Sequence, residues 1–304
     1  MLPSFLAALF FALSATCANR SLRIFGSVRA NLGRLLVAVA VLGGFAHTMG
    51  HGFSSASTRW FLASGIIGMG LGDLALYAAL PFLGSRLTVL MTQCLAAPLA
   101  AFGEWLWLGT TLTAPQVIWG VVILIGVAVA LLPTKASPPK VRLKPIGFLF
   151  GFLSACGQGF GALVSRKGVD VAEAAGEIVH HPIFGLNSAY HRILAGLLFT
   201  TLWFLVLRQL GRLPSGPTSR ASDQPPKNWR WIAANGLAGP VIGVGCYQWA
   251  LATTPSGIVL PIVATTPLLA IPIAYWLEHD RPTRRSILGA LIAVSGCIAL
   301  TLAR

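Results

Sequence analysis

Long apolar segments constrain the fold of this chain more than any other feature of its sequence. The segments reach about 17–23 residues, the length of helix that crosses a hydrocarbon core of about 30 Å. Buried strands of a soluble α/β protein give apolar runs of only about 4–8 residues. With 55% hydrophobic and 10% charged residues, the chain also lacks the polar side chains that a water-exposed surface needs. We therefore predict an all-α polytopic membrane protein.

The apolar segments and the polar breaks between them predict ten transmembrane helices. The segments are approximately 2–18, 30–48, 60–81, 87–108, 115–132, 145–165, 186–207, 230–252, 257–278 and 286–303. A Pro- and Lys-rich linker at 134–144 divides them five and five, so 1–133 and 145–304 are each expected to form a five-helix repeat. Residues 166–185 are expected to be an acidic loop with a short interfacial helix.

Short sequence matches recur in the same order in the two halves. Residues 10–15 (FFALSA) match 150–155 (FGFLSA), and 34–36 (RLL) match 192–194 (RIL). The fourth and fifth segments of each half match at 97–99 and 266–268 and at 119–126 and 288–296. Such ordered matches indicate a duplication. Because five is odd, the second half enters the membrane from the opposite side. This inverted repeat is typical of secondary transporters, which bind substrate near the midplane between the halves.

Basic residues are distributed unevenly between the two sides of the predicted bundle. Most of the 22 Lys and Arg residues lie in connections that follow odd-numbered segments, whereas Arg59, Arg166, Lys167 and Arg304 lie on the other side. The positive-inside rule then places both termini outside an inner or plasma membrane. This distribution accounts for the net charge of +14, and no nucleic-acid partner is expected.

Two carboxylates, Asp73 and Glu104, lie deep within apolar sequence. A carboxylate at the centre of a membrane helix costs about 2.5–3.5 kcal/mol and should face a cavity or a partner. Tyr77 follows Asp73 by one turn, and Gln93 shares a helix face with Glu104. Asp73 is a candidate for proton coupling or for binding a substrate ammonium, the alternative being a carboxylate satisfied by a neighbouring helix. Glu104 is a second cavity candidate, unless it extends to the lipid headgroups.

Polar residues at related positions of the two halves give further cavity candidates. Arg34 and Arg192 begin the second segment of each half, so the inverted repeat should place them toward opposite membrane faces. There they could bind substrate carboxylates, gate the two mouths or anchor the helices at the interface. Gln158, Gln248 and Trp249 line the cavity or make interhelical hydrogen bonds worth about 0.6–2 kcal/mol each.

Glycine and proline patterns predict how the helices pack and where they break. The spacing GxxxG, which favours close helix packing, occurs at Gly68/Gly72, Gly157/Gly161 and Gly239/Gly243. Pro98 and Pro267 are predicted helix breaks, because proline lacks the backbone donor, and the freed carbonyls could line a translocation path. No spacing of Cys, His, Asp or Glu indicates a metal site, and no cofactor is expected.

In their order over nearly the whole chain, these motifs resemble the drug/metabolite transporter superfamily, specifically proteins with two EamA domains. The residues that carry the resemblance are Arg34, Arg192, Pro98, Pro267, Gly120, Gly126, Gly289 and Gly296. The acidic turn common in that family is matched loosely at 279–283 (HDRPT), while 109–113 (GTTLT) lacks the acid. The resemblance implies a metabolite transporter, with segments 1–4 and 6–9 around the cavity and segments 5 and 10 at the periphery. Many family members have cytoplasmic termini, unlike the orientation that the charges predict here.

The predicted function is alternating-access transport of a small polar or amphipathic metabolite, with an amino acid as one candidate. Proton coupling through Asp73 is a further hypothesis. A membrane-embedded enzyme would need a polar catalytic cluster at one membrane face, and no such spacing is present. A non-transporting scaffold or receptor would not need a duplicated, inverted architecture. The expected partners are the substrate and the lipid bilayer, and a monomer suffices because the duplication supplies both halves.

Overall fold

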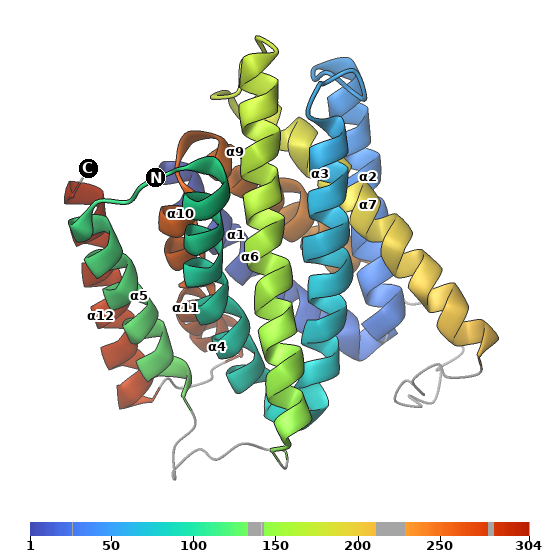
Figure 1. Cartoon of the computed structure of the whole chain (residues 1–304). Helices are drawn as coiled ribbons and strands as arrows, with labels where there is room; N and C mark the ends of the chain where they lie inside the picture. The colour runs from blue at the N-terminus through green and yellow to red at the C-terminus, as the bar shows by residue number, and fades with distance from the viewer. Residues whose placement is uncertain (26, 133–140, 142, 211–228, 279–282, 304) are drawn as a thin grey trace.

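The computed structural model describes residues 1–25, 27–132, 141, 143–210, 229–278 and 283–303, and these residues form helices and short connections without a strand (Figure 1). The helices are α1 (Leu2–Phe25), α2 (Ser27–Thr48), α3 (Thr58–Gly65), η1 (Ile66–Gly72), α4 (Asp73–Leu108), α5 (Ala114–Leu131), α6 (Pro145–Ala174), α7 (Pro182–Gln209), α8 (Arg230–Gly236), η2 (Leu237–Gly243), α9 (Val244–Thr253), α10 (Ser256–Val263), α11 (Thr266–Glu278) and α12 (Arg284–Leu302). Most of the predicted linker at 134–144 and of the acidic turn at 279–283 lies outside the described residues.

Several of these helices are long and apolar enough to cross a membrane. Within the described part of the chain there are seven such segments: Arg29–Thr48, Thr58–Leu108, Ala114–Leu131, Pro145–Ala174, Pro182–Gln209, Ser256–Ile273 and Arg284–Leu302. The apolar segment Leu2–Ala18 is shorter. The all-α, polytopic prediction agrees with this structure, and the number of ten crossings stays a prediction.

One helix boundary differs from the sequence-based expectation, and one expected break between segments is found. α6 continues to Ala174, so the acidic loop expected to begin at residue 166 is helical over its first half. Val169 and Ala172 on this extension are buried, which holds it against its neighbours. The two segments expected at 60–81 and 87–108 are separated by Gly84, with φ 72° and ψ 165°, a backbone conformation that favours glycine.

The predicted break at Pro98 is not found. α4 continues through this residue, and its non-helical φ/ψ values occur at Gly84. Proline is tolerated inside membrane helices when small local adjustments satisfy the freed carbonyl. Pro267 instead lies in the first turn of α11, after the short turn that ends α10. A missing backbone donor costs nothing at a helix start.

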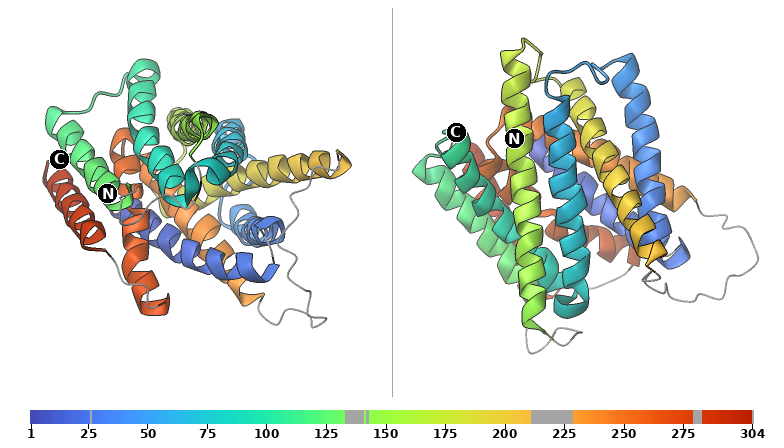
Figure 2. Two further views of the ribbon diagram at one scale, coloured as in Figure 1. Left: turned by 90° about the horizontal axis from the view of Figure 1, so that it is seen from below. Right: turned by 45° about the vertical axis from the view of Figure 1, so that its right-hand side comes forward.

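Helices from each half of the chain pack against helices of the other half. α3 and η1 pack against α6 and α7, whereas α8 and η2 pack against α1 and α2. α5 and α12 lie side by side at one edge of the molecule (Figures 1 and 2). The apolar side chains of Ile123, Val127 and Ala293 are buried in this pair. The two halves therefore form one packed unit.

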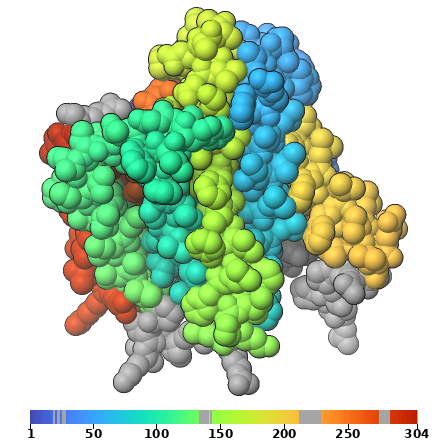
Figure 3. Space-filling view, viewed as in Figure 1, coloured from blue at the N-terminus to red at the C-terminus, as the bar shows by residue number. Residues whose placement is uncertain are grey.

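Glycines allow α6 to approach η1 more closely than other residues would. A Cβ atom on Gly161 would lie 3.0 Å from the Cα of Gly68, and one on Gly157 would overlap the backbone of Gly72. The packing role predicted from the two GxxxG spacings is thus confirmed. Figure 3 shows α6 along the full height of the molecule, between α3 on one side and α4 and α5 on the other.

A buried ion pair connects four helices at one end of the bundle. Arg166 Nε of α6 donates to Glu104 Oε1 of α4 over 2.9 Å, and Arg166 Nη1 donates to the Leu251 carbonyl of α9 over 2.6 Å. Glu104 Oε2 accepts from the backbone N–H of Ser256, the first residue of α10, over 2.7 Å and also from the Ser256 hydroxyl. The carboxylate thus lies at a helix N-terminus and the guanidinium near a helix C-terminus, where each charge is favourable.

We predict that Gly157→Ala destabilises the bundle. The added methyl group would overlap the Gly72 backbone, and overpacking of this kind costs about 1–3 kcal/mol. Gly44→Ala is the matched control, because a Cβ there has no atom within 4 Å. In detergent, the apparent melting temperature should fall for Gly157→Ala and stay the same or rise for Gly44→Ala. Equal behaviour of the two variants would contradict the close contact.

We also predict that Glu104→Gln costs about 3 kcal/mol, because it leaves the Arg166 guanidinium without its counter-charge. Glu173→Gln is the control, because the Glu173 side chain is 61% exposed. The double variant Glu104→Gln/Arg166→Gln should lose less stability than the sum of the two single variants. Strict additivity in denaturation measurements would show that the pair is not coupled.

Candidate functional site

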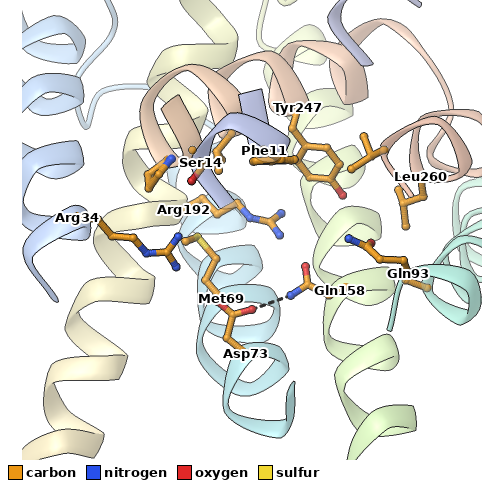
Figure 4. A pocket seen from close by; sticks show the side chains of 15 residues that line it. Phe11, Ser14, Arg34, Met69, Asp73, Gln93, Gln158, Arg192, Tyr247 and Leu260 are labelled. Carbon is orange, nitrogen blue, oxygen red and sulfur yellow. Dashed lines mark hydrogen bonds between the residues drawn. The ribbon is translucent and has the colours of Figure 1, made fainter. Parts of the chain in front are cut away.

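A cavity of about 190 Å³ lies between helices from both halves of the chain (Figure 4). Its lining residues are Phe11, Ser14, Arg34, Met69, Asp73, Gln93, Ala96, Gln158, Arg192, Gly239, Pro240, Val244, Tyr247, Leu260 and Val263. They come from α1, α2, η1, α4, α6, α7, η2, α9 and α10, and none lies on α5 or α12. This agrees with the expectation that the fifth and tenth segments are peripheral.

Two π-helical turns bring the backbone to the cavity from opposite halves of the chain. η1 ends immediately before Asp73, and η2 ends immediately before Val244. Each π-helical turn contains 7 residues. Such turns are rare in proteins, and those that occur are often found at functional sites. In η2, Pro240 removes a backbone donor, and both Gly239 and Pro240 line the cavity. The helices that follow both turns then carry side chains into the cavity.

Asp73 is held by an amide from the other half of the chain. Gln158 Nε2 donates to Asp73 Oδ1 over 3.0 Å and to the Gly68 carbonyl over 3.2 Å. Figure 4 shows the Asp73 carboxylate and the guanidinium groups of Arg34 and Arg192 around the same space. Asp73 thus faces a cavity and also has a hydrogen-bond partner, the two alternatives that its position in an apolar segment predicts.

Arg192 is buried, with 3% of its surface exposed. Its Nη1 donates to Ser64 Oγ over 2.7 Å, to Ser165 Oγ over 3.1 Å and to the Gly161 carbonyl over 3.4 Å. The guanidinium carbon lies 5.5 Å from the ring centroid of Tyr247, within the range of a cation–π contact. These contacts hold the guanidinium group at the cavity wall and exclude an anchoring role at the lipid interface.

Arg34 stands between the main cavity and a smaller one. The second cavity, of about 30 Å³, shares Arg34, Met69 and Asp73 with the first and extends to Tyr77 and Thr200. Arg34 Nε donates to Asn31 Oδ1 over 2.8 Å, which directs the guanidinium group across the cavity (Figure 4). Arg34 and Arg192 thus line one cavity, and the expectation that they lie toward opposite membrane faces stays a prediction.

The remaining predicted residues occupy different places. Gln93 lines the main cavity, whereas Tyr77 is 48% exposed and borders only the smaller one. Glu104 belongs to the ion pair with Arg166 and is not in the cavity lining. Trp249 Nε1 donates to the His180 carbonyl over 2.9 Å, also outside the lining.

Gln248 is also absent from the lining, and its neighbour Tyr247 is present instead. Gln248 is 1% exposed, and its amide has no hydrogen-bond partner among the described residues. Adjacent helical positions differ by about 100° around the axis. The rotation of the short helix α9, which the sequence pattern does not give, therefore decides which of the two residues faces the cavity.

Sequence reasoning also missed Phe11, Ser14 and Met69. Ser14 donates to Asn235 Oδ1 over 2.6 Å, so it links α1 to α8 beside the cavity. A signal for Ser14 was present, because the FFALSA repeat aligns it with Ser154, one turn before Gln158. Phe11 and Met69 are apolar residues in apolar segments, and their sequence does not distinguish them from residues that face lipid.

Comparisons with known proteins place this arrangement in a family. One solved structure, described only as "Crystal structure of protein", superposes with a TM-score of 0.72 at 17% sequence identity, covering 99% of this chain and 96% of that one. It is among 29 solved chains that match significantly, and at this identity the likeness concerns the fold. No curated protein matches significantly.

A family model provides the assignment. The EamA-like transporter family matches residues 1–132 and 145–302, which together span almost the whole chain. The resemblance based on Arg34, Arg192 and the glycine and proline positions is thereby confirmed. The chain belongs to the EamA-like transporter family and is a multi-pass membrane protein of the drug/metabolite transporter type.

Proposed function

We propose that this protein is a secondary transporter that carries a small polar or amphipathic metabolite through the central cavity by alternating access. The observation that carries the proposal is the convergence of polar side chains on one membrane-embedded cavity, with Arg34, Asp73 and Gln93 from the first half and Gln158 and Arg192 from the second. Charged groups at this depth are costly unless they serve a pathway or a partner. Family membership favours transport over catalysis.

The proposed architecture is two inverted repeats of five membrane-spanning helices. The reciprocal packing supports it: the η1 region of the first half lies on α6 and α7, and the η2 region of the second half lies on α1 and α2. Transporters with such repeats move one part against the other around a fixed site. Because both halves belong to one chain, we propose a functional monomer.

Contacts between loops support a conformation that is closed at one end. Glu177 accepts from Ser55 Oγ over 2.9 Å and from the Ala56 N–H over 2.8 Å, and His191 Nε2 lies 2.8 Å from the Gly52 carbonyl. These loops lie together at the upper end of Figure 1. The smaller cavity lies toward the start of α2 and the end of α7, on the opposite side. We infer that substrate reaches the site from that side in this conformation.

The orientation proposed from the charges has a direct test. With the termini outside, a cysteine at Thr111 should react with a membrane-impermeant maleimide on intact cells, and a cysteine at Lys144 only after permeabilisation. Both positions are exposed. The parent chain gives the background, because its 5 cysteines are all buried or half-buried. The reverse labelling pattern would establish cytoplasmic termini and overturn the proposed orientation.

Proton coupling is proposed to run through Asp73, the carboxylate in the cavity lining. The test begins with a panel of labelled metabolites screened for uptake driven by a pH gradient into proteoliposomes. Asp73→Asn should abolish this uptake for any substrate found, because the amide can neither bind nor release the proton. Asp170→Asn, which changes the same group on α6 outside the cavity lining, should leave it intact. Unchanged uptake by Asp73→Asn would contradict the coupling role, and binding without uptake of any kind would contradict transport.

A further inference from the structure

The charged side chains of the central cavity do not balance. The described lining contains the guanidinium groups of Arg34 and Arg192 and a single carboxylate, that of Asp73. The ion pairs among the described residues are Arg166–Glu104 and His180–Glu173, so neither cavity arginine is paired with a carboxylate within 4.0 Å. The cavity therefore carries an excess of one positive charge when Asp73 is ionised, and more when it is protonated.

The two guanidinium groups retain unused hydrogen-bonding capacity. Only Nη1 of Arg192 is hydrogen-bonded to described residues, and its partners are uncharged hydroxyls and a carbonyl. Arg34 uses Nε for Asn31 and makes no further hydrogen bond within the described structure. A desolvated guanidinium group is stabilised most by an anionic acceptor, and its planar donors match a carboxylate. Both groups extend into the same cavity (Figure 4).

The rest of the cavity lining is suited to the apolar part of an organic ligand. Phe11, Met69, Val244, Leu260 and Val263 give the cavity an apolar wall. Ligand sites commonly combine such walls with a few polar groups that fix the orientation of the ligand. At about 190 Å³, the cavity accommodates a small molecule.

We propose that the substrate is a small organic monoanion whose carboxylate binds between Arg34 and Arg192 while its apolar part contacts the opposite wall. This inference rests on the proposed transport function. A cation would add to the excess positive charge of the lining, and a zwitterion would leave that excess uncompensated. One carboxylate neutralises the excess, whereas a phosphate monoester, with about −1.5 to −2 charge, exceeds it. Asp73 in its ionised form thus restricts the site to a single negative charge.

Binding of charge-matched probes tests this assignment on the purified full-length protein in detergent. Pyruvate, 4-methyl-2-oxopentanoate and phenylpyruvate are monoanions with small, branched and aromatic bodies. The amino acids alanine, leucine and phenylalanine are their zwitterionic counterparts, and the corresponding amino acid amides are cations at a pH of about 6. At least one oxo acid should raise the melting temperature and bind about tenfold or more tightly than its cationic counterpart. If no oxo acid binds, or if the cation or zwitterion binds as tightly, the proposal is overturned.

Variants locate the binding site. Arg34→Gln and Arg192→Gln should each weaken oxo-acid binding about tenfold or more, as expected when one member of a buried charge pair is removed. Arg59→Gln is the matched control, because Arg59 is exposed and lies over Trp60, away from the cavity. Arg34 is half-buried, so its variant tests the site even if Arg192→Gln does not fold. Unchanged binding by Arg34→Gln would overturn the assignment. Oxo-acid binding without uptake into proteoliposomes would overturn the transport function and leave the anion site in place.

Discussion

The site depends on the close contact between α6 and η1. Lipid gives membrane helices no hydrophobic reason to associate, so packing of small residues supplies much of the attraction. Gly157 and Gly161 of α6 meet Gly72 and Gly68 of η1 backbone to backbone. This contact brings Gln158 within hydrogen-bond reach of Asp73, because the glutamine is adjacent to one of these glycines. The lack of a side chain at Gly68 also leaves space for the guanidinium group of Arg192. A Cβ atom on Gly68 would lie only 2.6 Å from Arg192 Nη2.

The two carboxylates placed in apolar sequence are satisfied in opposite ways. Glu104 accepts from Arg166 and twice from Ser256, and its charge is matched by the guanidinium group and the start of α10. Asp73 accepts from the neutral amide of Gln158 and faces two arginines across open space. A complete set of partners compensates the cost of burying a charge, whereas a charge with an incomplete set in a cavity can bind a ligand. This difference distinguishes the ion-paired Glu104 from Asp73, for which we propose a function, although both look alike in the sequence.

The features that depend on residue chemistry and local spacing were predictable. Apolar length predicts the membrane helices, and GxxxG spacing predicts the α6–η1 contact. The cost of a buried charge predicts that Asp73 faces a cavity or a partner. Features that depend on helix ends and helix rotation were not. Arg166 lay beyond the expected end of its segment at residue 165, so Glu104 had no visible partner. Similarly, the choice between Tyr247 and Gln248 follows from the rotation of α9, which is set by packing against other helices rather than by its own sequence.

The two halves share the backbone position of their π-helical turns but differ in the side chain that follows each turn. η1 and η2 occupy corresponding places, and each packs against the other half of the chain. The residue that follows η1 is Asp73 and the one that follows η2 is Val244, so a charged and an apolar side chain enter the cavity from equivalent backbone positions. In the proposed inverted repeat, a similar backbone on both sides permits exchange between two related conformations. The unlike side chains make the cavity asymmetric in charge, with a carboxylate after η1 and an apolar side chain after η2.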